Sequence, residues 1–236
     1  MSFLSASDTH KGNDRKNNED AVFCSSASGL WLVADGMGGH NAGEYASEAI
    51  VQSICEVTLS SDLGACVDAI EDRLLEVNDH LRHHARIECD GNTVGSTVVV
   101  LVARKGVGVV LWAGDSRLYR IRGRAVELIT RDHNPVADLL DSGGVTQQEV
   151  LCADTNVVTR AVGGQRELNL DVAVFDIEAG DTMLLCSDGL YREVSPTRLA
   201  EYMDQDVDCA LDGLMDHCLS GPARDNISVI VTRACE

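Results

Sequence analysis

The sequence has little proline, few aromatic side chains and no long apolar run. It contains 3 prolines among 236 residues and 4% aromatic residues, and no stretch is rich in serine or glycine, so we find no linker or repeat and expect one domain over residues 1–236. The longest apolar run, residues 98–103, is too short to span a bilayer. The N-terminus lacks the basic and apolar segments of a signal peptide, and we therefore expect a cytoplasmic protein without membrane contact.

Positive charges and closely spaced cysteines are also scarce. The 19 lysines and arginines face 38 aspartates and glutamates, and a formal net charge of −19 excludes the electrostatic attraction on which nucleic-acid binding depends. The 9 cysteines are scattered, odd in number and without a Cys-x-x-Cys pair, which argues against a thiolate zinc site. Cysteines of this kind are typical of a reducing compartment.

Short apolar runs joined by glycine-containing links predict antiparallel strands. The links at residues 28–29, 105–106, 123–124 and 179–180 predict hairpins between the runs that they join. The predicted strands are residues 20–26, 30–35, 96–104, 107–115, 117–122, 125–130, 170–177, 181–188 and 227–233.

Amphipathic patterns with helical spacing lie before, between and after these strands. Their apolar residues recur every three or four positions, which places them on one face of a helix. Together these elements predict an α+β fold, with two packed antiparallel β-sheets (a β-sandwich) flanked by helices on both outer faces. The predicted helices are residues 43–58, 63–84, 134–142, 196–203 and 207–219.

Five aspartates stand where predicted strands begin or end. Asp20 opens one strand and Asp35 closes its hairpin partner, so both reach the same edge. Asp115 and Asp188 close later hairpins, and Asp225 precedes the last strand. If these edges coincide, the carboxylates converge and repel one another unless a cation lies between them. Carboxylates without histidine or cysteine suit magnesium, manganese or calcium, and a pair of such ions could activate water.

Glycines follow Asp35 at three of the next four positions, which are Gly36, Gly38 and Gly39. Glycine allows the backbone to approach an ion or an anion at conformations that a Cβ would forbid. A single strand-terminal aspartate before glycine is usually an ordinary turn. The joint occurrence with Asn-Glu-Asp at 18–20 and Gly-Asp-Ser at 114–116 is harder to explain as turns alone.

Eight sequence motifs occur in order through nearly the whole chain. Together they resemble the metal-dependent protein phosphatases of type 2C, specifically their compact bacterial Ser/Thr branch. The segments are GNDRKNNEDAV (12–22), VADGMGGHNAGEYAS (33–47), GSTVVV (95–100), WAGDSRLYRIR (112–122), TRDHN (130–134), NVVTRAVGG (156–164), GDTMLLCSDGL (180–190) and ARDNISVIV (223–231).

The resemblance implies two Mn²⁺ or Mg²⁺ ions at one end of the sandwich. By motif position, Asp35 bridges both ions and the Gly36 carbonyl joins it on one of them. Asp188 and Asp225 complete the shell of the other ion. Asp115 matches a ligand for a third, weaker ion found in bacterial members.

The resemblance also assigns Glu19 and Asp20 to metal-bound waters and Arg15 to the substrate phosphate. It implies that a metal-bridging hydroxide hydrolyses phosphoserine and phosphothreonine without a protein nucleophile. The implied partners are phosphorylated proteins and an opposing bacterial Ser/Thr kinase, and the implied state is a monomer. Eukaryotic members place histidine where this chain has Met37, so the acid that protonates the leaving group stays unassigned. His40 is a nearby alternative to a metal-bound water, although an ordinary solvated loop histidine is the more common case.

The polar segment 132–163 corresponds, by the same resemblance, to a flap beside the active site. An ordinary helical insertion is equally compatible with its composition. A cluster of arginines interrupts the acidic sequence and could dock an acidic or phosphorylated partner, although a solvated sheet face explains it more simply. These arginines are Arg117, Arg120, Arg122, Arg124 and Arg131.

Two other functions compete with the phosphatase. A β-sandwich module could bind Ca²⁺ at its acidic edge for structural purposes, but the free-thiol pattern and Arg15 beside the acidic cluster argue against it. An inactive, phosphatase-like regulator is disfavoured because every aspartate that matches a metal ligand is present.

Overall fold

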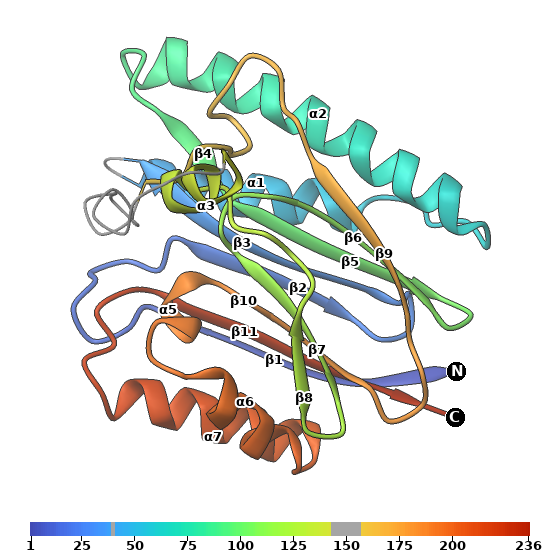
Figure 1. Ribbon diagram of the computed structural model, residues 1–236. Helices are drawn as coiled ribbons and strands as arrows, with labels where there is room; N and C mark the ends of the chain where they lie inside the picture. Colours follow the sequence, from blue (N-terminus) through green and yellow to red (C-terminus); the bar gives the residue numbers. More distant parts are fainter. Residues whose placement is uncertain (39–40, 143–156) are drawn as a thin grey trace.

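A computed structural model describes residues 1–38, 41–142 and 157–236, with only the backbone given for 141 and 142. Two antiparallel sheets pack face to face between two layers of helices (Figure 1). The predicted α+β sandwich is therefore confirmed. No helix among these residues is long and apolar enough to cross a membrane.

One sheet has 6 strands in the order β2-β3-β5-β6-β9, with β4 paired to β3 beside this path. Two amphipathic helices, α1 (Ala42–Cys55) and α2 (Leu63–Glu88), cover its outer face (Figure 1). The strands are β2 (Asp20–Ser25), β3 (Leu30–Gly38), β4 (Val94–Ser96), β5 (Val98–Arg104), β6 (Val107–Ala113) and β9 (Asp171–Asp176).

The other sheet has 5 strands in the order β1-β11-β10-β7-β8. Its outer face is covered by α6 (Pro196–Met203) and α7 (Val207–Leu219). Two other short helices, α3 (Pro135–Ser142) and α5 (Asp188–Tyr191), lie near one end of the sandwich (Figure 1). The strands are β1 (Ser2–His10), β7 (Arg117–Arg122), β8 (Ala125–Leu128), β10 (Thr182–Cys186) and β11 (Ile227–Cys235).

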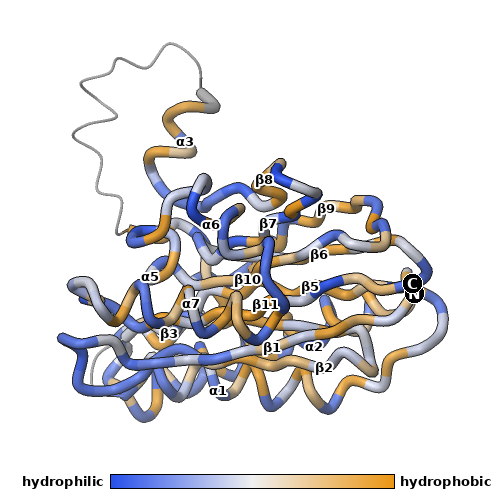
Figure 2. The backbone as a smooth tube through the Cα atoms, turned by 90° about the horizontal axis from the view of Figure 1, so that it is seen from below, coloured by the Kyte–Doolittle hydropathy of each residue, from blue (hydrophilic) through white to orange (hydrophobic). Residues whose placement is uncertain are grey.

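The core lies between the sheets and beneath each helix layer. Trp31 and Leu101 from one sheet pack in the same cluster as Met183 and Ile230 from the other, and all four side chains are fully buried. Burying a large apolar side chain contributes about 1.5–3 kcal/mol to folding, so this central layer fixes how the sheets lie on each other. In Figure 2 the hydrophobic colour follows the strands, whereas many connecting loops are hydrophilic.

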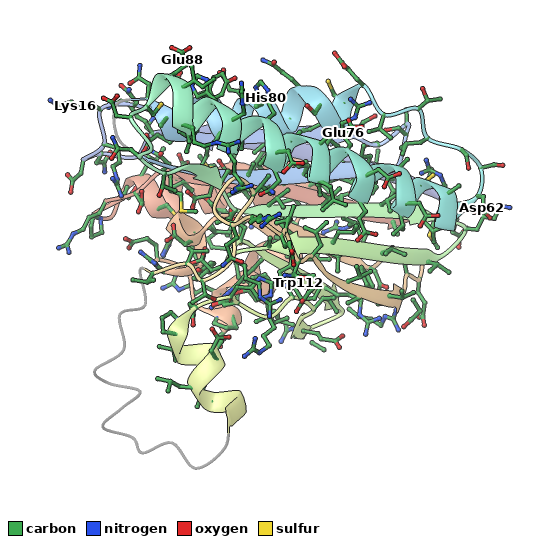
Figure 3. The ribbon with its side chains drawn as sticks, turned by 90° about the horizontal axis from the view of Figure 1, so that it is seen from above. Lys16, Asp62, Glu76, His80, Glu88 and Trp112 are labelled. Carbon is green, nitrogen blue, oxygen red and sulfur yellow. The ribbon has the colours of Figure 1, made fainter. Side chains whose placement is uncertain are left out.

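Several of the helices begin where a side chain accepts a hydrogen bond from a free backbone N–H group. Asp62 accepts a hydrogen bond from the Ala65 N–H at 2.9 Å and starts α2, and Figure 3 shows Asp62 and Glu88 at opposite ends of this long helix. Ser195 and Asp206 cap α6 and α7 in the same way. The bounds predicted for α6 and α7 are confirmed, because a side-chain cap and an amphipathic run coincide in both.

The hairpin predicted at residues 179–180 is wrong. Strand β9 pairs with β6 in the six-stranded sheet, whereas β10 lies between β11 and β7 in the other sheet, so the link crosses from one sheet to the other. The other three predicted hairpins, β2–β3, β5–β6 and β7–β8, are confirmed. Strand β1 has no apolar run and was not predicted; it forms an edge of the five-stranded sheet by pairing with β11.

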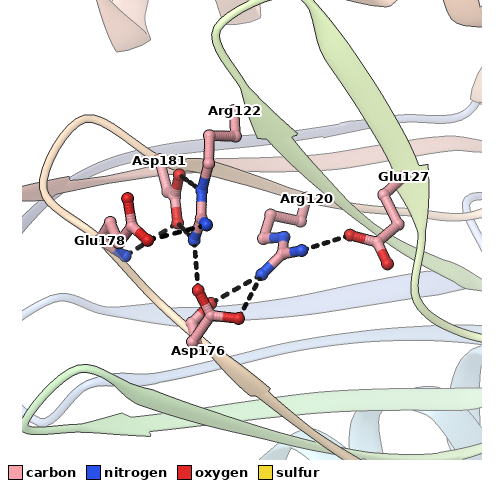
Figure 4. Close-up of polar contacts among 6 residues, drawn as sticks. All are labelled: Arg120, Arg122, Glu127, Asp176, Glu178 and Asp181. Atoms are coloured by element: carbon pink, nitrogen blue, oxygen red, sulfur yellow. Dashed lines mark hydrogen bonds and ion pairs between the residues drawn. The ribbon is translucent and has the colours of Figure 1, made fainter.

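Carboxylates surround two of the clustered arginines, which lie on β7 (Figure 4). Arg120 donates to two acidic side chains and Arg122 to three, so their positive charge is satisfied within the molecule and a docking role for them loses its basis. The acceptors are Glu127, Asp176, Glu178 and Asp181.

Asp181 should contribute most to stability in this network because its side chain is only 1% exposed. It accepts hydrogen bonds from Arg122 Nε and Nη2 at 2.7 Å and from the Glu178 N–H at 2.8 Å. We expect Asp181→Ala to lower the free energy of unfolding by about 1–3 kcal/mol, the range for buried donors that lose their acceptor. Urea denaturation would measure this. The matched control is Glu178→Gln, because the Glu178 side chain is 66% exposed. It should lower the free energy of unfolding clearly less than Asp181→Ala. Equal losses of unfolding free energy would contradict the prediction.

Candidate metal and phosphate site

A cavity of about 290 Å³ lies at the end of the sandwich where β3 and β10 finish and where β2 and β11 begin. In Figure 1 this end, marked by α5 and by the end of β3, is opposite the two chain termini. The cavity is lined by Arg15, Glu19, Asp35, Gly36, Met37, Gly38, Thr97, Asp115, Val158, Asp188, Arg192, Asp225 and Asn226.

Strand pairing brings the first two aspartates together. Asp20 and Asp35 are direct partners in the β2–β3 register, as the predicted hairpin requires. The strand does not stop at Asp35, however, because β3 continues to Gly38 and its glycine segment pairs with β4. Gly36 N donates to the Glu19 carbonyl at 3.0 Å, and a Cβ at Gly36 would lie 2.1 Å from the carbonyl oxygen of Gly43. Only glycine therefore lets the start of α1 close against the site.

The remaining aspartates reach the cavity from three other segments. Asp188 is the first residue of α5 and does not end a strand as predicted, while Asp225 lies just before β11. Asp115 lies two residues beyond the end of β6, after Gly114, whose φ of 116° and close contact with Thr97 both require glycine. All five aspartates are thus at one end, with Asp20 buried just behind the lining.

Burial and mutual repulsion raise the pKa values of four of these carboxyl groups. Burial, opposed by hydrogen bonds from Ser187 and Ser228, raises the pKa of Asp20 to about 7, and burial raises that of Asp188 to about 6. Burial and then the charges of Asp20 and Asp188 raise the pKa of Asp35 well above its usual value. Burial is also the main cause that raises the pKa of Asp115. These carboxylates are costly to keep ionised without positive charge.

Two arginines contribute positive charge from the cavity wall. Arg15 Nη2 lies 3.0 Å from Asp225 Oδ2, and Arg192 Nη2 lies 2.8 Å from Asp188 Oδ2. Arg15 was predicted, but Arg192 was missed. Its position four residues after Asp188 would have suggested a contact only if α5 had been predicted to be helical.

Two further residues that sequence reasoning missed hold the loops in place. Thr97 Oγ1 accepts a hydrogen bond from the Asp35 N–H at 3.1 Å. Asn226 accepts from the Glu19 N–H at 2.8 Å and donates to the carbonyls of Lys11 and Asn17 at 3.0 Å, so it anchors the loop that carries Arg15. Both are ordinary polar residues in the sequence, and only the tertiary contacts reveal their roles.

The donor set fits a hard divalent cation. Among the described residues no three acidic, histidine or cysteine side chains are already closed around one point, yet the oxygens Asp20 Oδ1 and Asp188 Oδ1 are buried without a hydrogen-bond partner. Buried carboxylate oxygens without partners are rare because each costs free energy. A bound cation would satisfy them and offset the repulsion, and oxygen donors are what Mg²⁺ and Mn²⁺ prefer.

Parts of two predicted features lie outside the described residues. These parts are Gly39 and His40 of the glycine segment and residues 143–156 of the predicted flap. The described parts of that segment join at its base, where Thr159 N donates to the carbonyl of His133 at 2.8 Å. Met37 lines the cavity as expected.

The family model of protein phosphatase 2C matches residues 8–218 of this chain. The chain belongs to the protein phosphatase 2C family. Similar proteins are bacterial phosphatases. The protein phosphatase PhpP of Streptococcus pneumoniae is 32% identical over 238 residues, covering 94% of this chain and 93% of PhpP. The protein is accordingly a bacterial-type, metal-dependent protein-serine/threonine phosphatase.

Solved structures of this phosphatase family match the fold closely. PppA, a key regulatory component of T6SS in Pseudomonas aeruginosa, is 42% identical with a TM-score of 0.91, covering 99% of this chain and 98% of PppA. The catalytic domain of the phosphatase PstP, in complex with 2 manganese ions, is 30% identical with a TM-score of 0.85 over 100% and 99% of the two chains.

The raised pKa values predict how the metal-free phosphatase responds to pH. Because Asp20 and Asp188 have folded pKa values of about 7 and about 6, against 3.8 ordinarily, their contribution to stability is complete below the ordinary value and is lost as pH rises through the folded values. We expect the Tm of chelator-treated protein to fall between about pH 4 and about pH 7.5 and then to level off, and Mn²⁺ to reverse most of that fall at the upper end of the range.

Asp188→Asn separates this effect from other titrating groups. In chelator-treated protein the variant should show a flatter dependence of Tm on pH than the wild type and a higher Tm near the upper end of that range. A wild type and variant with parallel Tm profiles would contradict the assignment of the repulsion to this site.

Proposed function

We propose that this phosphatase removes phosphate from phosphoserine and phosphothreonine in cytoplasmic proteins with the help of two Mn²⁺ or Mg²⁺ ions, and that it opposes a bacterial Ser/Thr kinase. The observation that carries the proposal is the pair of buried, partnerless carboxylate oxygens of Asp20 and Asp188 beside a cavity that also holds Arg15. One site therefore combines carboxylates that can bind metal cations with an arginine that can bind a phosphate anion.

The ligand roles are those that the resemblance to type 2C phosphatases implies, and the chemistry of each group agrees with them. Asp35 would contact both ions, and the charges of the four other aspartates all act on its carboxylate. Asp188 and Asp225 would join it on one ion and the Gly36 carbonyl on the other. Glu19 and Asp20 would hold water molecules at the ions, a role that suits carboxylates placed behind the direct ligands. Asp115 would hold a third, weaker ion.

Bound in this way, the ions would supply a water molecule activated at neutral pH and would balance charge on the phosphoryl group. Arg15, whose side chain is 52% exposed, lies at the edge of the site, where its fork can orient phosphoryl oxygens. Met37 and Val158 contribute apolar surface that limits water around the reacting group. Met37 has no proton to give, so the acid that protonates the leaving oxygen stays unassigned, with a water molecule at the ions and His40 as its two candidates.

A structural calcium module is disfavoured by family membership, because the similar proteins are named as phosphatases. The 8 cysteines that the structure describes are all free, which supports a reducing compartment such as the bacterial cytoplasm. The 42% identity to PppA supports a more specific role as a regulator of T6SS. Phosphoproteins that accumulate in cells lacking this phosphatase would identify its substrates and the kinase it opposes.

Asp35→Asn tests the metal assignment. Chelator-treated wild type should lose hydrolysis of an aryl phosphate and regain it with Mn²⁺ or Mg²⁺, whereas the variant should stay at least about 10²-fold less active at any metal concentration. Calorimetric titration with Mn²⁺ should lose its tight phase. Arg15→Ala is the comparison: it should retain the tight phase while raising KM. An unchanged isotherm in Asp35→Asn would refute the bridging role.

Asp115→Asn tests the third ion separately. Asp115 lacks the glycine cradle of Asp35 and lies beside Asp188, so its ion should have fewer protein ligands and bind more weakly. We expect kcat to fall about 10²-fold while the two tight Mn²⁺ sites and the Tm persist. The three quantities should be measured on one preparation. A near-normal kcat would remove Asp115 from the reaction, and loss of tight Mn²⁺ would make it a ligand of the main pair.

A further inference from the structure

Two arginines approach the cavity from different segments, and each is held by an aspartate. Arg15 comes from the loop after β1 and contacts Asp225, while Arg192 follows α5 and contacts Asp188. Both line the same cavity of about 290 Å³. No role follows for Arg192 from the ligand assignment above, although it lies as close to the carboxylates as Arg15 does.

Arg192 is placed by rigid local structure. Its N–H donates to the Asp188 carbonyl at 3.1 Å, one helical turn back, so the two side chains meet on one face. The neighbouring Tyr191 ring lies under the Arg117 guanidinium at 3.6 Å, and Arg117 is held by Asp132 through two hydrogen bonds of 2.9 and 2.7 Å. The segment that carries Arg192 is therefore supported by a partly buried charge pair.

The guanidinium of Arg192 has more donors than its one aspartate uses. Within the described part of the chain, Asp188 Oδ2 is the polar partner of its side chain, through Nη2 at 2.8 Å, and the side chain is 36% exposed. An arginine has five N–H donors in a planar fork. Asp188 therefore anchors one side of the fork and leaves donors available toward the cavity that Arg192 lines.

Each arginine is held at the cavity wall by a different aspartate. Arg15 contacts Asp225 and Arg192 contacts Asp188, and all four residues line the cavity. Because the cavity measures only about 290 Å³, one phosphate-sized anion in it can meet both guanidinium groups.

We propose that Arg192 is a second phosphate-binding residue, which contacts the phosphoryl group of the substrate together with Arg15 while Asp188 anchors it. A phosphomonoester has three terminal oxygens, so ions and a single arginine leave room for a further donor. This inference rests on the proposed function, because it needs a phosphorylated substrate in this cavity. An acidic side chain of a protein substrate would be recognised by the same chemistry, and the experiment separates the two.

The test compares Arg192→Gln and Arg192→Lys with the wild type, loaded with Mn²⁺. Three quantities are measured: inhibition of aryl phosphate hydrolysis by inorganic phosphate, KM for the aryl phosphate, and the Mn²⁺ isotherm. We expect Arg192→Gln to weaken phosphate inhibition and raise KM by about tenfold each, the effect of losing one charge-assisted contact. The tight Mn²⁺ phase should persist, and Arg192→Lys should recover part of the loss. Arg198→Gln, an exposed arginine on α6 outside the lining, is the matched control and should behave as the wild type.

Each other outcome is decisive. Unchanged phosphate inhibition and KM in Arg192→Gln would overturn the proposal, even if phosphopeptides with acidic neighbours were hydrolysed more slowly, because Arg192 would then recognise the peptide. Loss of the tight Mn²⁺ phase would also overturn it and leave Arg192 as a support for Asp188. A wild type that hydrolyses nothing, yet gains Tm with inorganic phosphate where Arg192→Gln does not, would refute the proposed function and leave Arg192 as a binder of phosphate without hydrolysis.

Discussion

Repulsion among buried carboxylates is the constraint on which this molecule depends. The β2–β3 register sets Asp20 against Asp35, and the start of α5 brings Asp188 close enough to raise the pKa of Asp35 further. Left to themselves, these groups would separate or take up protons. They stay together because each is fixed by a backbone that the sandwich core holds, from strands buried on both faces.

The cost of this arrangement explains the local irregularities around it. Glycines at 36 and 114 remove side chains where backbones must approach, and Thr97 and Asn226 replace missing backbone partners with side-chain hydrogen bonds. Proteins break ordinary folding rules mainly where function needs it. Here a scaffold with a buried core supports one end whose carboxylates, once ionised, need cations to offset their repulsion.

Much of this could be inferred from the sequence because its local signals agree with the fold. The glycine links of three hairpins and the caps of α6 and α7 act within a few residues, so their outcome does not depend on the rest of the chain. The resemblance also placed Arg15 and the five aspartates at one end. What could not be inferred depends on distant contacts. The link at 179–180 looks like a hairpin, but each of its strands finds a better partner elsewhere. Strand β1 has no apolar pattern because it lies at an edge, and Arg192 became visible only once α5 was known to be a helix.

The pairing of β1 with β11 has a consequence for how the molecule is made. Ser2 lies opposite Cys235 and His10 opposite Ile227. During synthesis β1 therefore cannot pair until β11 has left the ribosome, and only then can the five-stranded sheet close. Contacts of such large sequence separation slow folding, because the entropy of closing the chain is lost before they form. The same two segments carry Arg15, which follows β1, and Asp225, which precedes β11. The cavity is therefore completed late in biosynthesis, and a nascent chain cannot hydrolyse phosphoproteins before its sandwich has closed.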